Sequence, residues 1–340
     1  MMINDTILNI IITIIKIVVI LSVAMLHVAF AVYFERKVIG HMQRRMGPME
    51  VGPKGILQSF ADVVKLFFKE DLVPASADKP LFYIAPIIGI AATMGSLSVV
   101  PFFNGFAIAD IKVGLLFLFA MSSLGAYAVI LAGWASNSKY SFLGGMRSSA
   151  QVISYEVSMG LSLVGVMIMA GSLNLNDIVA AQQNFSTKLY LIPQIIGFFV
   201  FVLSAMAETN RVPFDLPEAE QELVAGYFTE YSGMRFALFF LAEYIGMLVM
   251  SSVAVVCFLG GWGLPGFIYS MFNGSAIIIS ILEVLCFLIK LYACMFFYYW
   301  VRSTLPRYRY DQLMSLGWKI LIPLSVFNIL ITGTIKMFVN

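Results

Sequence analysis

Carboxyl groups are concentrated in one short stretch of the chain, AETNRVPFDLPEAEQEL, which covers residues 207–223. The stretch carries five acids against one base, Arg211, and it follows a long apolar segment. A carboxyl group desolvated beside apolar residues favours its protonated form and can exchange protons near neutral pH. The pattern therefore predicts either a proton-exchanging site or a solvated acidic surface helix. The five acids are Glu208, Asp215, Glu218, Glu220 and Glu222.

Helix geometry divides these acids between two faces. Asp215, followed three residues later by Glu218, is typical of the start of a helix. At ~100° per residue, Glu218 and Glu222 then share one face, whereas Glu220 falls among apolar residues. Glu220 is therefore the candidate for an inward-facing carboxyl.

Further ionisable residues lie inside long apolar segments. Such charges cost at least ~2.5–3.5 kcal/mol each and usually mark an ion or proton path. We expect Glu208, Glu230, Glu156 and Glu243 to form an acid series that leads from an inner loop toward the middle of the membrane, with Glu156 in the first turns of its helix. Glu283 and Lys290 are two helical turns apart, about 10 Å, so a bridging residue or water is expected between them. The remaining such charge is Lys16.

The composition is typical of an integral membrane protein. Hydrophobic residues make up 60% of the chain and charged residues 12%, and the mean hydropathy is +0.91, whereas soluble proteins have about 25% charged residues. The three cysteines show no Cys-x-x-Cys spacing and only two histidines occur. A disulfide framework, a zinc site and an iron–sulfur cluster built by this chain are therefore excluded, and no metal site is predicted.

The sequence also argues against a nucleotide site and a cleaved leader. GWGLPG at residues 261–266 fits a glycine-rich dinucleotide motif but follows an apolar segment instead of a strand, so we expect this chain to bind no cofactor itself. The N-terminal stretch lacks a basic region and a cleavage site, which predicts a retained helix.

We predict an all-α polytopic membrane protein with residues 1–340 as a single membrane domain. A span needs about 20 apolar residues, and eight stretches qualify. An amphipathic helix at 54–70 is expected to lie in the membrane interface, because Gln58, Asp62, Lys65 and Lys69 form a polar stripe opposite an apolar one. The acidic inner loop is 208–235. The predicted spans are 7–34, 81–103, 113–134, 152–170, 189–207, 236–259, 277–301 and 320–338.

The distribution of positive charge predicts the orientation. The loops after the odd-numbered spans carry fifteen Lys and Arg residues, or sixteen with Lys319. The other loops and the tails carry three, namely Lys112, Lys188 and Lys336. By the positive-inside rule the odd loops are cytoplasmic and both termini are outside.

Four longer stretches carry a resemblance to a known family. They are ERKVIGHMQRRMGPMEVGPKGILQSFADVVKLFFKED (35–71), GWASNSKYSFLGGMRSSAQVISYE (133–156), AETNRVPFDLPEAEQELVAGYFTEYSGMRFALFFLAEY (207–244) and VRSTLPRYRYDQLMSLGWK (301–319). Together they resemble the H-type membrane subunit of the proton-pumping NADH:quinone oxidoreductase, respiratory complex I, whose mitochondrial counterpart is NADH dehydrogenase subunit 1. The resemblance runs in order along nearly the whole chain.

The resemblance implies a role in quinone reduction and proton translocation. The inner loops would form the membrane side of a quinone chamber, while FMN and iron–sulfur clusters would reside in partner subunits. The implied partners are peripheral-arm subunits, small and antiporter-like membrane subunits, quinone and the lipid bilayer of a bacterial inner membrane (a mitochondrial one being the alternative), with no nucleic acid. The third span lacks the acid that some relatives place there. The implied site residues are Glu35, Arg36, Asp62 and Lys65 for quinone, and Glu156, Glu208, Glu218, Glu220, Glu222, Glu230 and Glu243 for coupling.

Other functions remain open on the sequence. A ferredoxin- or deazaflavin-linked oxidoreductase or a membrane-bound hydrogenase would use a related subunit. A secondary transporter would be expected to show an internal repeat with matching broken helices, and none is visible in the sequence. A pure scaffold would leave the buried acids unexplained.

Overall fold

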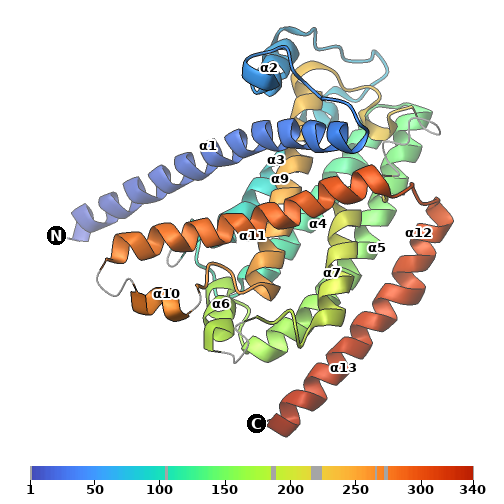
Figure 1. The fold of residues 1–340 in the computed structure, drawn as a ribbon. Coiled ribbons are helices and arrows are strands. Elements are labelled where there is room, and N and C mark those ends of the chain that lie inside the picture. Colours follow the sequence, from blue (N-terminus) through green and yellow to red (C-terminus); the bar gives the residue numbers. More distant parts are fainter. Residues whose placement is uncertain are drawn as a thin grey trace. The chain divides into compact units, whose positions relative to one another are not determined.

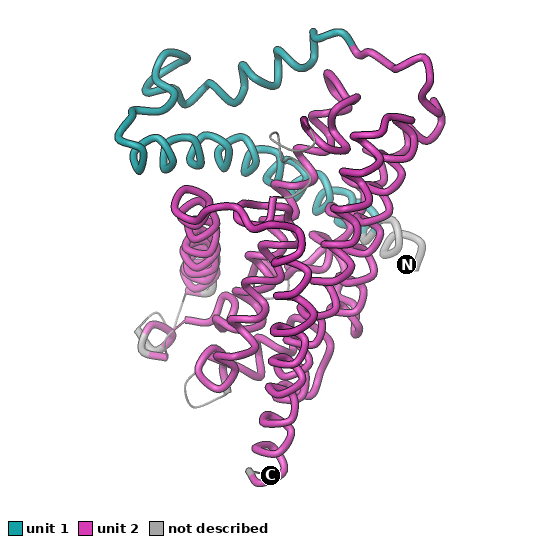
Figure 2. Tube along the Cα trace, turned by 90° about the vertical axis from the view of Figure 1, so that its right-hand side faces the viewer, with its two compact units in different colours: residues 1–70 teal, residues 71–340 magenta. Residues whose placement is uncertain are grey.

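The described part of the chain is helical and contains no β-strand. The computed structural model describes residues 2–103, 106–184, 189–215, 224–264, 266–271 and 275–339. It divides into two compact units, Met1–Glu70 and Asp71–Asn340 (Figures 1 and 2). The predicted all-α class is confirmed.

The first unit contains a long helix and a short one. α1 (Met2–Met42) is followed by a 3-10 turn, η1 (Pro53–Gly55), and by α2 (Gln58–Phe68). The Phe30 and Phe60 rings join the two helices edge to face, with centroids 6.4 Å apart. The helix expected at 54–70 thus starts later. Gly55 has a φ of 80°, and a Cβ on it would lie 2.3 Å from the Pro48 carbonyl oxygen, so the chain turns there first.

The second unit is a bundle in which the buried helix α9 occupies the interior. α9 packs against α3 and α11, α3 against α4, and α5 against α4, α7 and α13. A stack of Phe82 on Tyr231, with centroids 4.0 Å apart, contributes to its core. The helices are α3 (Lys79–Val99), α4 (Gly114–Ala135), α5 (Lys139–Ala170), α6 (Leu175–Asn184), α7 (Ile195–Glu208), η2 (Gly226–Phe228), α9 (Gly233–Phe258), α10 (Gly266–Met271), α11 (Ala276–Thr304), α12 (Tyr310–Leu316), the π-helical η3 (Gly317–Leu321) and α13 (Ile322–Val339).

Seven helices of the described chain are long and apolar enough to cross a membrane. They are α1, α3, α4, α5, α9, α11 and the continuous run from α12 to α13. The span expected at 189–207 corresponds to α7, which has 14 residues and is therefore about 21 Å long, shorter than the ~30 Å hydrocarbon layer. Eight spans therefore remain a prediction, while a polytopic membrane protein is supported.

The fourth predicted span is longer than expected. α5 begins at Lys139, well before residue 152, so Glu156 lies in the middle of the helix and not in its first turns. Hydropathy missed this part because it is rich in polar residues, although Ser141, Ser148 and Gln151 are buried. The absence of side chains at Gly133 and Gly145 lets α4 and α5 approach closely there, since a Cβ on Gly133 would lie 3.2 Å from the Gly145 Cα.

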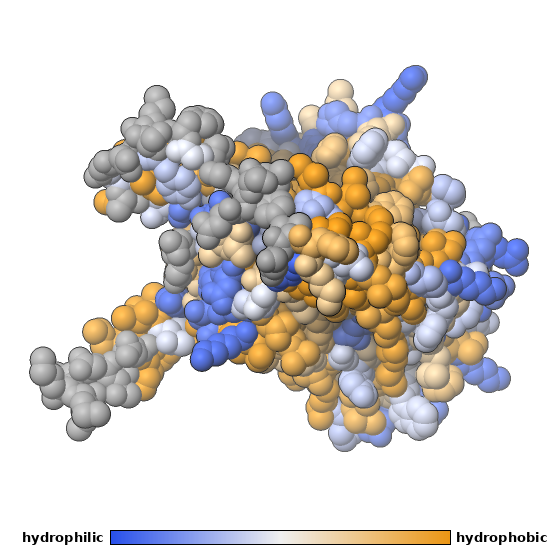
Figure 3. Space-filling view, turned by 90° about the horizontal axis from the view of Figure 1, so that it is seen from below, coloured by the Kyte–Doolittle hydropathy of each residue, from blue (hydrophilic) through white to orange (hydrophobic). Residues whose placement is uncertain are grey.

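Apolar side chains cover broad parts of the surface. Figure 3 shows them over much of the face seen from below. Exposed examples on three helices are Leu116, Ile289 and Leu330, each more than 60% exposed. A soluble monomer rarely exposes so much contiguous apolar surface, whereas lipid is a suitable environment for it.

Candidate functional site

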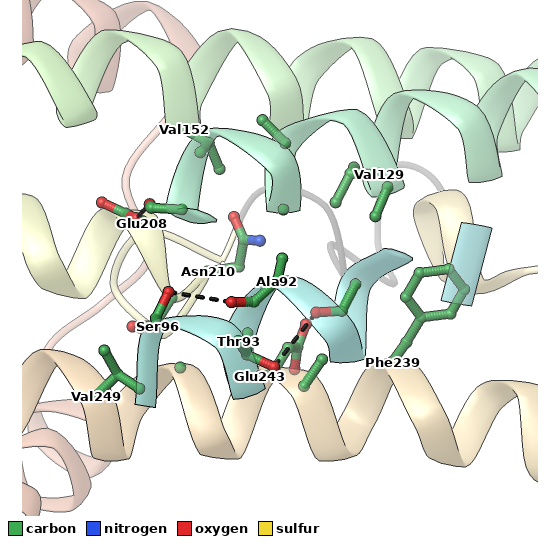
Figure 4. Close-up of a pocket in the computed structure, with 18 of the residues that line it drawn as sticks. Ala92, Thr93, Ser96, Val129, Val152, Glu208, Asn210, Phe239, Glu243 and Val249 are labelled. Carbon is green, nitrogen blue, oxygen red and sulfur yellow. Dashed lines mark hydrogen bonds between the residues drawn. The ribbon is translucent and has the colours of Figure 1, made fainter. Parts of the chain in front are cut away.

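A cavity in the second unit brings two partly buried acids together. It has a volume of about 110 Å³ and is bordered by α3, α4, α5, α9, η2 and the end of α7. Glu208 and Glu243 reach it from different elements (Figure 4). Thr93, Ser96, Ser122 and Asn210 add polar groups to an otherwise mostly apolar wall. We call this space the acid cavity.

Glu208 is the last residue of α7. The helix ends there because Asn210 adopts a left-handed conformation with a φ of 49°, which asparagine tolerates well at helix ends. The Ser122 hydroxyl of α4 donates to the Glu208 carboxylate oxygen Oε1. The second oxygen, Oε2, is buried and has no hydrogen-bond partner in the described part of the chain.

Glu156 on α5 is held by Ser123, the residue that follows Ser122 on α4. The Ser123 Oγ lies 2.5 Å from the Glu156 Oε1, and Glu156 and Glu208 interact electrostatically. The adjacent residues Ser122 and Ser123 therefore link two glutamates from two other helices. Neither serine stood out among the acids in the sequence, although a polar pair inside an uncharged, largely apolar helix is a recognisable signal.

Glu243 on α9 differs from these two because it has a cationic partner. The Arg211 Nη2 lies 3.7 Å from the Glu243 Oε2, and both side chains are nearly buried, with 7% and 11% exposed. The Tyr227 hydroxyl lies 3.4 Å from the Glu243 Oε1, and the Arg211 guanidinium sits 4.2 Å from the centre of the Tyr244 ring. Of the two acids that line the cavity, Glu243 is thus paired with a cation, whereas Glu208 is bonded by the Ser122 hydroxyl.

A buried glutamine fixes the loop between these acids. The Gln151 amide Nε2 donates to the Ala207 carbonyl at 2.6 Å and to the Phe214 carbonyl at 2.7 Å. Next in the loop, the Asp215 Oδ2 lies 3.0 Å from the Arg307 Nη2. Burial raises the pKa of the Asp215 carboxyl above its ordinary value, and the Arg307 guanidinium opposes this shift. These contacts therefore hold the start of the loop, residues 207–215.

The remaining acids of the loop stand apart from the cavity. Glu230 is partly buried between η2 and α9 and does not line the acid cavity. Glu218, Glu220 and Glu222 lie outside the described residues, so the predicted inward position of Glu220 remains a prediction.

Among the described residues, Glu283 and Lys290 have separate partners. The Tyr269 hydroxyl donates to the Glu283 Oε1 at 3.0 Å. The Lys290 ammonium donates instead to the Gly261 carbonyl at 2.9 Å. Each charge thus has its own partner in the connection between α9 and α11, and the bridging residue or water expected between them stays a prediction.

In the first unit, two of the four residues assigned to quinone form an ion pair. The Arg36 Nη1 lies 2.6 Å from the Asp62 Oδ2, and the Gln58 amide donates to the other Asp62 oxygen at 3.1 Å. Glu35 is buried and Lys65 is exposed. The structure therefore brings Arg36 of α1 to Asp62 of α2, while Lys65 faces outward. Within the described residues, no group of three or more His, Cys, Asp or Glu could hold a metal ion.

Comparison with known proteins shows the family to which the chain belongs. Residues 15–333 match a family model described as NADH dehydrogenase. The chain is 52% identical over 306 residues to the H-type NADH-quinone oxidoreductase subunit of Rhodospirillum centenum, covering 90% of this chain and 88% of the relative. It is 47% identical over 345 residues to the second H-type NADH-quinone oxidoreductase subunit of Koribacter versatilis, covering 95% and 96%, and 49% identical over 327 residues to the Brevibacillus brevis counterpart, covering 96% and 94%. The chain therefore belongs to the NADH dehydrogenase family.

Proposed function

We propose that this chain is a membrane-arm subunit of a proton-translocating NADH:quinone oxidoreductase in a bacterial inner membrane. The observation that carries the proposal is the identity of about half of all residues, along nearly the whole length, to subunits of NADH-quinone oxidoreductases. The chain works as one membrane domain with eight spans, both termini outside and the odd loops cytoplasmic. FMN and iron–sulfur clusters belong to partner subunits, which include peripheral-arm, small and antiporter-like subunits.

The first unit forms the membrane side of the quinone chamber. Quinone has an apolar tail and a polar headgroup, so it needs an entrance that offers both environments. The amphipathic α2 lies in the interface, and the Arg36 guanidinium, fixed by Asp62, supplies a positive charge near the headgroup. Glu35 precedes Arg36 on α1, and Lys65 follows Asp62 by three residues on α2.

The second unit couples quinone reduction to proton movement. Reduction places negative charge near the inner face, and buried carboxyls respond to added charge by taking up protons. Glu208 and Glu243 share the acid cavity, and Glu156 interacts with Glu208. These acids carry the response into the membrane, and Glu218, Glu220, Glu222 and Glu230 connect it to the loop.

Purification of the tagged chain from its native membranes tests this function. We expect a large assembly that contains flavin and iron–sulfur clusters and reduces quinone with NADH. An assembly that accepts electrons from ferredoxin, deazaflavin or hydrogen and not from NADH would support the related oxidoreductases instead. An isolated oligomer without redox cofactors would contradict the proposal and favour a transporter or scaffold.

A further inference from the structure

α4 contributes no acid to the coupling region. Its 22 residues, GLLFLFAMSSLGAYAVILAGWA, contain no charged side chain. Ser122 and Ser123 nevertheless lie between two glutamates that have no cationic partner in the described part of the chain. Because adjacent helical residues point about 100° apart, Ser122 reaches Glu208 at the end of α7 while Ser123 reaches Glu156 on α5.

We infer that Ser122 and Ser123 are positioning residues that hold Glu156 and Glu208 together as one proton-exchanging pair. α4 has no carboxyl of its own, and it contributes to the coupling region through these two hydroxyls. The inference rests on the proposed coupling function and adds two residues to it. Neither serine is assigned a transfer step, since each acts by holding a glutamate in place.

A hydroxyl suits this role because it can bond both forms of a carboxyl. It donates to an ionised carboxylate and, after rotation, accepts from a protonated carboxyl. A lysine or a backbone N–H can only donate, and would therefore favour one form strongly. The bonds to Glu156 and Glu208 consequently persist while their protonation changes.

Ser123 has a second acceptor that defines the alternative state of its hydroxyl. Its Oγ lies 3.1 Å from the Phe119 carbonyl oxygen and 2.5 Å from the Glu156 Oε1. With its single proton directed to Phe119, the hydroxyl accepts from a protonated Glu156. With Glu156 ionised, the same proton turns to the carboxylate, so rotation of one hydroxyl follows the charge on Glu156.

Glu208 connects the pair to the acid cavity. Its Oε1 accepts from Ser122, whereas its buried Oε2 has no hydrogen-bond partner among the described residues. The carboxyl borders a cavity of about 110 Å³, which is large enough to admit water. The serine-held pair is therefore connected to Glu243 through a cavity that water can enter.

Among the described residues, few other titratable groups lie near the pair. On the cavity side, Glu243 is paired with Arg211 and contacted by Tyr227. From α11, Tyr298 interacts electrostatically with Glu208. The α3 wall of the cavity offers only small and hydroxyl side chains, including Thr93 and Ser96. Glu156 and Glu208, which have no cationic partner among the described residues, are thus contacted by Ser123 and Ser122, respectively.

The test compares alanine and threonine variants of the assembled complex in sealed vesicles. Ser122→Ala and Ser123→Ala remove a donor that an ionised carboxylate needs more than a protonated carboxyl does. We expect the pH profile of proton uptake to move about one unit to higher pH, the size expected for one charge-assisted hydrogen bond. Ser122→Thr and Ser123→Thr keep the hydroxyl and should restore the wild-type profile.

Ser252→Ala is the matched control. Ser252 is a buried serine on α9 that does not line the acid cavity, and its hydroxyl bonds the Leu248 carbonyl at 2.7 Å, so its removal should leave the profile unchanged. If the alanine variants fail to assemble, Ser122→Cys and Ser123→Cys take their place, because the thiol is similar in size and a weak donor. A wild-type pH profile in the alanine or cysteine variants overturns the inference.

A second readout separates this inference from the proposed function. Infrared difference spectra upon quinone reduction report hydrogen bonding of protonated carboxyls, and Glu156→Gln and Glu208→Gln identify the bands. The serine variants should shift those bands. A wild-type complex that reduces no quinone with NADH would refute the proposed function, whereas a fully active wild type with unshifted bands in the serine variants refutes only the role of the serines.

Discussion

Arg36 carries its positive charge on a guanidinium that contacts Asp62, with 46% of the Arg36 side chain exposed. An ion pair this exposed contributes only about 0–1 kcal/mol to stability, so the chain does not need it for folding. Arg36→Ala should therefore leave assembly intact. Quinone reduction should fall about tenfold, as expected for losing one charge-assisted contact of ~1.5 kcal/mol, and quinone-site inhibitors should bind more weakly.

The measurement compares NADH-dependent quinone reduction with reduction of a hydrophilic acceptor that draws electrons upstream. Lys65→Ala removes the same charge from the outward side of α2 and serves as the matched control, with a smaller loss expected. If Arg36→Ala lowers both activities equally, Arg36 supports the structure of the complex and not quinone binding.

At the level of residues, the sequence shows which acids lie within or beside apolar segments but not which partners they have. Glu156, Glu208 and Glu243 stand out because a charge inside an apolar segment is costly and needs a reason. Their partners could not be derived in the same way. The Arg211–Glu243 pair and the serine contacts depend on how α4, α5, α7 and α9 approach each other, which periodicity along one helix does not contain.

At the level of elements, the contact between α5 and η2 depends on glycine. A Cβ on Gly144 would lie 2.6 Å from the Gly226 Cα, which is backbone and cannot rotate away. Gly144→Ala should therefore push α5 from η2 and destabilise the protein by about 1–3 kcal/mol, as overpacking typically does. The thermal unfolding temperature of the purified assembly measures this effect.

Gly160→Ala in the same helix is the control for this change. Its nearest neighbour would be the Phe119 ring at 3.9 Å, an ordinary contact. Alanine there should be neutral or stabilising by up to ~1 kcal/mol, because alanine favours the helix more than glycine does. Equal losses in the two variants would show that the close approach to η2 does not limit stability.

Hydropathy predicted the elements well where a helix is apolar throughout. α3, α4, α9 and α11 lie within a few residues of their expected ranges. Hydropathy does not predict helices whose buried residues are polar, as in the first half of α5, where Gln151 is buried and bonds the Phe214 carbonyl of the loop after α7. It also overestimated α7, since the N–H of Leu191 bonds the Phe258 carbonyl and the chain becomes helical only at Ile195.

At the scale of the whole molecule, charge asymmetry predicts the orientation that the proposed function requires. Quinone reduction by a cytoplasmic NADH-oxidising arm needs the loops of residues 35–71 and 208–235 on the inner side. The positive charge of the odd loops predicts that these loops are on the cytoplasmic side. Two exposed lysines are suitable reporters, one for each predicted side. Lys112 follows α3 and Lys139 begins α5, and both side chains are exposed.

Labelling of single cysteines in a variant without the three native cysteines tests this orientation. Lys112→Cys should react with a membrane-impermeant thiol reagent in intact cells, because its loop is predicted to face out. Lys139→Cys should stay unlabelled in cells and react in inverted vesicles, or after detergent treatment where a partner subunit covers it. Both reporters replace an exposed lysine, so differences in reactivity reflect the side of the membrane. Labelling of Lys139→Cys in intact cells would put the acidic loop outside and separate the acid cavity from any electron donor in the cytoplasm.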